Sequence, residues 1–125
     1  MNQNIIDKYK INFINKVQNW ETSGKEVSKT LDVNNEYLGM FLICWDSVSE
    51  INDSLLPDIE EALANPKLEV NSDSPPVDIV MSEGLVDFYG YKGYANSIPL
   101  QEFKEIVIGW RDFLNTPPLN GTKIP

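Results

Sequence analysis

The chain has 125 residues, of which 42% are hydrophobic, so it is long enough to enclose one core and predicts a single domain over residues 1–125. Its 10 basic residues stand against 19 acidic ones, which gives a formal net charge of -9. A surface of this charge repels nucleic-acid phosphates, and direct binding of DNA or RNA is disfavoured.

The sequence lacks histidine, which removes the commonest general base and the usual zinc ligand. The single cysteine, Cys44, lies in an apolar run from Leu38 to Trp45 and is expected to be a buried small hydrophobe. No calcium-loop pattern and no glycine-rich phosphate loop occurs, so the sequence predicts neither a metal site nor a cofactor. The chain has no apolar run of about 18 to 20 residues and no basic leader, which predicts a cytoplasmic protein that does not cross a membrane.

The first half of the chain is read mainly as helical. Apolar residues spaced by three and four predict a helix from about Asn4 to Trp20, with one face formed by Ile6, Tyr9, Phe13, Val17 and Trp20. A short second helix is expected around Val27 and Leu31. The stretch 37–51 fits either a buried strand or a helix, and its length slightly favours the helix.

The next helix is expected to carry Pro57 in its first turn, with Asp53 or Ser54 as its cap, and to end at Asn65 and Pro66. Its inward residues are predicted to be Leu55, Leu56, Ile59 and Leu63. Residues 67–76 and the tail after Pro117 are expected to have little order.

The clearest local signal is a β-hairpin at about 77–91, closed by Glu83 and Gly84. That turn would pair Met81 with Val86, Ile79 with Phe88 and Val77 with Gly90, and Pro75 and Pro76 are expected to block extension of the ladder. The opposite face would carry Asp78, Val80, Asp87 and Tyr89.

A final amphipathic helix is predicted at about 98–115, with a buried stripe of Leu100, Phe103, Val107, Trp110 and Leu114. A hairpin alone is marginally stable and must pack on helices. The sequence therefore predicts an α+β fold in which helices cover a small antiparallel sheet.

The negative charge is concentrated in the middle of the chain. Residues 36–91 hold twelve acids against Lys67 alone, whereas both ends are nearly neutral. This distribution is typical either of a solvated acidic face or of a surface that attracts a basic partner. On the second reading, the partner-binding residues are expected among acids and tyrosines of the middle region, namely Asp58, Glu60, Glu61, Asp78, Glu83, Asp87, Tyr89, Tyr91 and Tyr94.

About half of the chain resembles a known class of protein. The segments are SLLPDIEEAL at 54–63, PPVDIV at 75–80, VDFYGY at 86–91 and IPLQEFKEIVIGWRDFL at 98–114. The residue pattern of these segments is similar to that of small bacterial immunity proteins of polymorphic toxin systems, including those of contact-dependent growth inhibition. The resemblance implies a cytoplasmic inhibitor, without enzymatic activity, that binds and neutralises a cognate toxin domain, often a nuclease. It implies no particular site residue.

Two other classes of function stay open on the residues. The chain would also suit an acidic protein-binding adaptor or regulatory subunit, and a pair of carboxylates would suffice for a glycosidase-type enzyme. A homo-oligomer is also compatible with the sequence.

Overall fold

The computed structural model describes residues 1–22 and 24–125, and its fold is α+β, as predicted. The helices are α1 (Gln3–Tyr9), α2 (Glu36–Cys44), α3 (Val48–Glu50), α4 (Leu56–Ala64) and α5 (Leu100–Leu114), with a π-helical turn η1 (Ile51–Leu55) between α3 and α4. The strands are β1 (Asn12–Trp20), β2 (Gly24–Asp32), β3 (Val70–Ser74), β4 (Val77–Ser82), β5 (Leu85–Gly90), β6 (Gly93–Pro99) and β7 (Lys123–Ile124).

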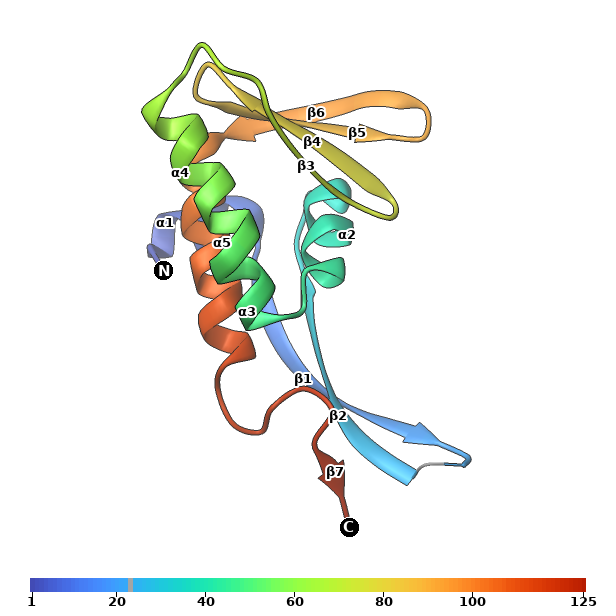
Figure 1. Cartoon of the computed structure of the whole chain (residues 1–125). Coiled ribbons are helices and arrows are strands. Elements are labelled where there is room, and N and C mark those ends of the chain that lie inside the picture. The colour runs from blue at the N-terminus through green and yellow to red at the C-terminus, as the bar shows by residue number, and fades with distance from the viewer. Residues whose placement is uncertain (23) are drawn as a thin grey trace.

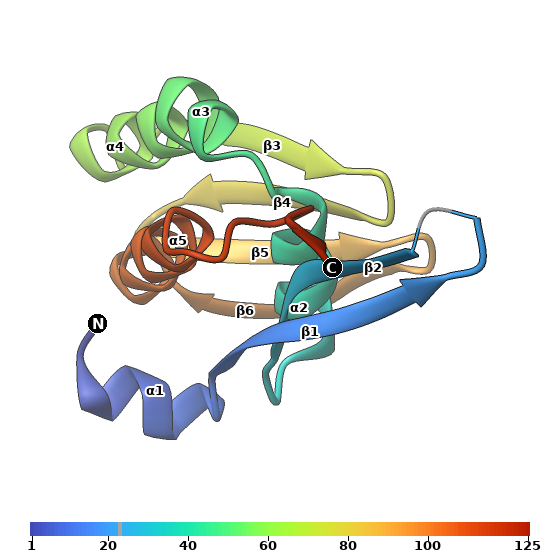
Figure 2. The same ribbon diagram turned by 90° about the horizontal axis from the view of Figure 1, so that it is seen from below.

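The strands form two antiparallel sheets. Strands β3, β4, β5 and β6 follow one another in chain order, and helices α2, α4 and α5 pack against one face of this sheet (Figures 1 and 2). Strands β1, β2 and β7 form the second sheet, in which β7 lies beside β2 and leaves β1 at an edge. The β1 and β2 hairpin projects away from the helices toward the end of the molecule that holds the C-terminus (Figure 1).

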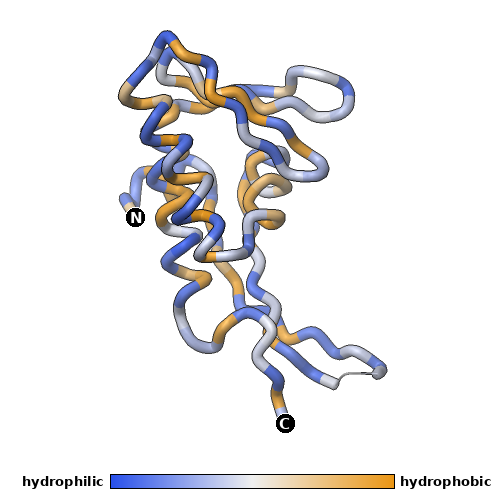
Figure 3. The backbone as a smooth tube through the Cα atoms, viewed as in Figure 1, coloured by the Kyte–Doolittle hydropathy of each residue, from blue (hydrophilic) through white to orange (hydrophobic). Residues whose placement is uncertain are grey.

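The core lies between the four-stranded sheet and the helices. Its largest fully buried side chains include Trp110, Phe41, Phe88 and Phe103. Apolar residues recur along α2, α5 and the strands that they cover (Figure 3). Trp110 is fully buried, as predicted for the stripe of the last helix, and all five residues of that stripe are buried.

The predicted hairpin is confirmed as β4 and β5. Glu83 and Gly84 have positive φ angles of 51° and 75°, which suit a two-residue turn of type I′. Met81 lies opposite Val86 and Ile79 lies opposite Phe88, as expected. The paired register begins at Asp78 and Tyr89, so the expected Val77 and Gly90 pair is not part of it.

The prediction of one helix from Asn4 to Trp20 is wrong. Helix α1 ends at Tyr9, because Lys10 adopts a left-handed conformation with φ of 51°, and strand β1 follows. Nine residue pairs join β1 to β2, and this nonlocal pairing overrides the helical spacing. Val17 and Trp20, expected to be buried, are therefore exposed.

The short helix expected at Val27 and Leu31 is also wrong, because both residues lie in β2. A spacing of four residues satisfies the period of a strand as well as that of a helix, and Val27, Lys29 and Leu31 are all buried on one face of the strand. The helical reading of 37–51 is confirmed for α2, whose cap Asn35 accepts a hydrogen bond from the Leu38 backbone N–H.

Three further expectations need correction. Cys44 is exposed, because it lies at the last position of α2 and not within the core. Asp53 and Ser54 do not cap α4, since both lie inside the π-helical turn that precedes it. Pro57 is in the first turn of α4 and Leu55 and Ile59 are buried, as predicted, but Leu56 and Leu63 are only partly buried.

The two segments expected to have little order both contain strands. Residues 70–74 form β3, and Pro75 and Pro76 make its turn into β4 where they were expected to block the ladder. The tail after Pro117 forms β7 and pairs with Lys25 and Glu26 of β2. Strand β3 is mostly polar and β7 has only two residues, so neither sequence shows the apolar alternation by which strands are recognised.

Candidate functional site

Among the described residues, the helices that contact the four-stranded sheet all pack on one of its faces and leave its other face uncovered (Figure 1). Its inner face carries buried apolar residues such as Ile79, Met81, Val86 and Phe88, and the alternate residues point to the opposite side. We call that opposite side the outer face, and the strand register places on it Asn71, Asp73, Asp78, Val80, Asp87, Tyr89, Tyr94 and Ser97. These residues come from all four strands, so the outer face is one continuous surface.

Two aspartates lie directly opposite each other on the outer face. Asp73 of β3 pairs in register with Asp78 of β4, across the turn made by the two prolines. Like charges in this position oppose each other and destabilise the pairing. The ion pairs found among residues 1–22 and 24–125 all involve other acids. Among the described residues, no lysine or arginine forms an ion pair with an aspartate of the outer face, which therefore carries concentrated negative charge.

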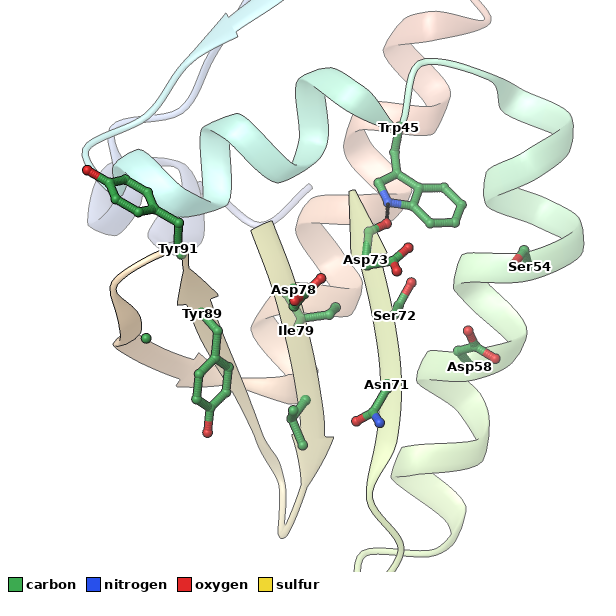
Figure 4. A pocket seen from close by; sticks show the side chains of 13 residues that line it. Trp45, Ser54, Asp58, Asn71, Ser72, Asp73, Asp78, Ile79, Tyr89 and Tyr91 are labelled. Carbon is green, nitrogen blue, oxygen red and sulfur yellow. Dashed lines mark hydrogen bonds between the residues drawn. The ribbon is translucent and has the colours of Figure 1, made fainter. Parts of the chain in front are cut away.

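A depression of about 770 Å³ opens beside these aspartates (Figure 4). Trp45, Ser54 and Asp58 line it from one side of β3, and Asp78, Tyr89 and Tyr91 line it from the other. A second depression of about 500 Å³ shares Trp45, Asp73 and Asp78 with the first and adds Cys44 and Glu50. Asp58, Asp73 and Asp78 thus line the larger depression, which we call the acidic hollow, and Glu50, Asp73 and Asp78 line the smaller one beside it; neither lining contains a lysine or arginine.

Trp45 fixes the position of β3 at this hollow. Its indole Nε1 donates a hydrogen bond of 3.0 Å to the backbone carbonyl of Asp73, which lies on the strand edge away from β4. Its own backbone carbonyl accepts a hydrogen bond of 2.8 Å from Trp110 Nε1 in α5. Asp73 is therefore held by a chain of contacts that reaches into the core.

Asp58 of α4 lines the hollow and is partly buried. Partial burial raises the pKa of its carboxyl above the ordinary value, and the negative charge of Glu61 raises it further. Both causes penalise the ionised form of Asp58. A cation placed in the hollow would act in the opposite direction and favour that form.

Asp87 and two tyrosines form a connected polar group at the other end of the outer face. The Ser97 hydroxyl donates to an oxygen of Asp87 and lies 2.8 Å from the Tyr94 hydroxyl. The Tyr94 ring meets the Tyr89 ring edge to face, with centroids 5.8 Å apart. Tyr91 lies in the turn between β5 and β6, where 94% of its surface is exposed and Lys92 lies near its ring.

The structure brings together some of the predicted binding residues and separates others. Asp58, Asp78, Tyr89 and Tyr91 line the depression, and Asp87 and Tyr94 lie on the same face of the sheet. Glu60 instead forms an ion pair with Lys104 of α5, and Glu83 pairs with Lys67 at 3.3 Å beside the turn between β4 and β5. Glu61 does not line either depression, and its negative charge raises the pKa of the Asp58 carboxyl.

Sequence reasoning missed Trp45, Asp73 and Glu50. In the sequence Trp45 ends an apolar run, and the only signal for a polar contact is that a partly buried indole N–H usually finds a hydrogen-bond acceptor. Asp73 fell in the segment expected to have little order, and its alignment with Asp78 depends on the two prolines acting as a turn. Glu50 carried no local signal.

Within residues 1–22 and 24–125, no three or more Cys, Asp or Glu side chains gather closely enough to hold a metal ion. The helices of the described chain are all too short or too polar to cross a lipid bilayer.

No family model, curated protein or solved structure matches the chain.

Proposed function

We propose that this chain is a cytoplasmic immunity protein that binds and neutralises a cognate bacterial toxin domain through the outer face of its four-stranded sheet. The observation that carries the proposal is the pairing of Asp73 with Asp78 on a face without basic residues. Such an arrangement costs the isolated protein stability, and a cationic partner relieves the cost. The resemblance of the chain to small immunity proteins supports the same function.

The chemistry of the outer face indicates a basic protein partner. A nuclease has a cationic cleft that binds phosphates, and an acidic surface steers such a cleft toward itself and competes with its substrate. The hollow bordered by Asp58, Asp73 and Asp78 has room for the end of a lysine or arginine side chain. The function is therefore capture of a protein, with no cofactor and no turnover of a substrate.

The tyrosines supply the apolar part of the proposed interface. Tyr89 and Tyr94 lie together on the outer face, and Tyr91 projects at its end. Large aromatic side chains with a polar tip are enriched among the residues that dominate binding energy at protein interfaces. We expect them to anchor the partner, while the aspartates orient it.

The test is to look for a toxin domain encoded next to this protein and to measure protection against it. The variant Asp78→Lys with Asp87→Lys reverses two charges on the outer face. A matched variant, Asp7→Lys with Asp32→Lys, makes the same change in net charge at exposed positions of α1 and β2. We expect the first variant to lose protection against the toxin and the second to keep it, with both variants folded.

Two results would contradict the proposal. Equal protection by both variants would show that total charge or another surface carries the function. Copurification of a partner other than the toxin, without any protection, would favour the alternative of an acidic adaptor or regulatory subunit.

A further inference from the structure

The hairpin of β1 and β2 forms an arm that extends beyond the helices (Figures 1 and 2). Near its end, 55% of Val17 and 48% of Trp20 are exposed, although these are large apolar residues. The base of the arm is anchored, because Phe13 packs against Trp110 and Phe113 of α5. The outer part of the arm thus presents apolar side chains on a strand that is held in place.

Strand β1 has a free edge whose polar groups can be assigned. The Val27 N–H donates to the Thr122 carbonyl and the Val27 carbonyl accepts from the Gly121 N–H, so the backbone groups of Val27 point away from β1. Val17 lies directly opposite Val27. In an antiparallel ladder, when the backbone groups of one residue point away from its opposite partner, those of the partner point away as well. The N–H and C=O of Val17 therefore face the free edge, together with those of Asn15 and Asn19 two residues away.

We propose that two copies of this chain pair through the free edges of β1, antiparallel, with Val17 of one copy opposite Val17 of the other. The two Val17 residues exchange a pair of backbone hydrogen bonds at the twofold axis, and each Asn15 does the same with Asn19 of the second copy. The two arms then form one continuous sheet. This inference rests on the arm alone and not on the proposed function of the outer face.

The side chains of β1 fit this register. Ile14 lies opposite Trp20 of the second copy, which places two apolar residues side by side. Lys16, the only charged residue of β1, lies opposite the neutral Gln18. Pairing Asn15 with Asn19 puts two amides together, and the strand contains no proline that would interrupt the ladder.

Lys16 also selects this register over its neighbour. Shifting the axis by one residue places Lys16 opposite Lys16 of the second copy, which puts two like charges in direct opposition. Exposed edge strands are commonly protected by a lysine against indiscriminate pairing. In β1 the single lysine excludes one self-pairing register and leaves the adjacent one free of charge conflict.

The first test removes the central hydrogen bonds without disturbing the arm. Because the Val17 N–H does not point toward β2, Val17→Pro should keep the β1 and β2 ladder while removing the donor at the twofold axis. Sedimentation equilibrium over a concentration series should show a dimer for the parent chain. The dissociation constant of the dimer should rise about tenfold or more in Val17→Pro, because both central hydrogen bonds are lost.

A charge pair at Gln18 tests the register. Gln18→Glu places a carboxylate opposite Lys16 of the second copy, and Gln18→Lys places a second ammonium there. We expect the first variant to tighten the dimer and the second to weaken it, each by about threefold or more. Within one copy Gln18 lies opposite Glu26, so the effects on the isolated arm have the opposite sign and cannot mimic this result.

Disulfide trapping gives an independent readout. In a Cys44→Ala background, Val17→Cys brings two thiols together at the axis, where the Cα atoms of paired residues are about 5.5 Å apart. The control Asn19→Cys is on the same strand, but its two copies are offset by four residues, or about 13 Å along the strand. We expect a crosslinked dimer only for Val17→Cys. A parent chain that stays monomeric at its solubility limit, or a dimer that Val17→Pro leaves unchanged, would overturn the proposal.

Discussion

The indole N–H of Trp110 donates a hydrogen bond of 2.8 Å to the backbone carbonyl of Trp45, which joins the middle of α5 to the end of α2. The Trp45 indole in turn binds the Asp73 carbonyl of β3. Two tryptophans thus connect the core to the strand that carries Asp73. The position of the candidate site therefore depends on Trp110, which is fully buried, as well as on Trp45, which lines the site.

Trp110→Ala should destabilise the protein strongly. The side chain is fully buried against Phe13 and Phe113, and its removal leaves a cavity as well as an unpaired Trp45 carbonyl. We expect a loss of about 3 to 5 kcal/mol in the free energy of unfolding, measured by urea denaturation. Trp110→Phe keeps most of the packing and should lose less. A Trp110→Ala variant as stable as the parent, yet unable to bind the partner, would show that Trp110 belongs to the interface.

Glu102→Gln should weaken the protein at neutral pH and flatten its acid unfolding. Hydrogen bonds from Lys8 and then from Tyr9 hold the pKa of the Glu102 carboxyl below its ordinary value, and so tie α5 to α1. The unfolded chain takes up a proton at Glu102 at a higher pH than the folded chain does. The stabilisation that the ionised carboxylate gives the folded protein is therefore complete at neutral pH. It is lost as pH falls through the ordinary glutamate range toward the folded pKa.

The measurement is the midpoint of thermal unfolding between pH 7 and pH 3. The difference between the parent and Glu102→Gln should shrink as pH falls, while Glu105→Gln, three residues further along the same helix, should follow the parent. Parallel curves for the parent and Glu102→Gln would contradict the role given to this carboxylate.

The parts of the fold that could be predicted are those with a local signal. The turn at Glu83 and Gly84 fixes its own hairpin, and the stripe of α5 repeats over four turns of helix. Strands β1 and β2 could not be predicted, because Val27 and Leu31 fit a helix and a strand equally well. The two segments form strands and not helices because they pair with each other along the arm.

The candidate site could be predicted only in part for a similar reason. Asp78, Asp87 and Tyr89 share a face because a hairpin of known register alternates its side chains, whereas Tyr94 reaches that face on β6, a strand that the sequence did not predict. Strand β3 is polar, and it is held in place by the proline turn and by the hydrogen bond from the Trp45 indole. The pairing of Asp73 with Asp78 is therefore a property of the tertiary structure and not of any segment.

Cys44 should react quickly with thiol reagents in the folded protein. It is exposed at the end of α2 and lines the smaller depression together with Asp78. We expect stoichiometric modification in native buffer, and Cys44→Ala should change the free energy of unfolding by no more than about 0.5 kcal/mol. A bulky maleimide on Cys44 should also hinder binding at the outer face. Slow labelling that needs denaturant would show that Cys44 is buried in the core.

Gly90→Ala should disturb the junction between β5 and α2. A Cβ atom at Gly90 would lie 2.6 Å from the Tyr37 ring, closer than real contacts allow, and the ring is partly buried. We expect a loss of about 1 to 3 kcal/mol in unfolding free energy, which Tyr37→Ala in the same chain should reduce. Additive losses in the double variant would show that the two residues do not interact.

Association with the toxin domain should depend strongly on salt. Under the proposed function, the outer face attracts a basic partner before contact, and mobile ions screen this attraction over a Debye length of about 10 Å at 0.1 M ionic strength. The association rate should therefore fall steeply as salt rises, while the dissociation rate, which reflects close contacts such as those of Tyr89 and Tyr94, should change less. The measurement is a stopped-flow series over ionic strength for the parent and for Asp78→Lys with Asp87→Lys. The reversed variant should associate slowly at low salt and show a much flatter salt dependence. If the parent rate is itself flat, steering by the outer face plays no part, and recognition must lie in its tyrosines or elsewhere on the chain.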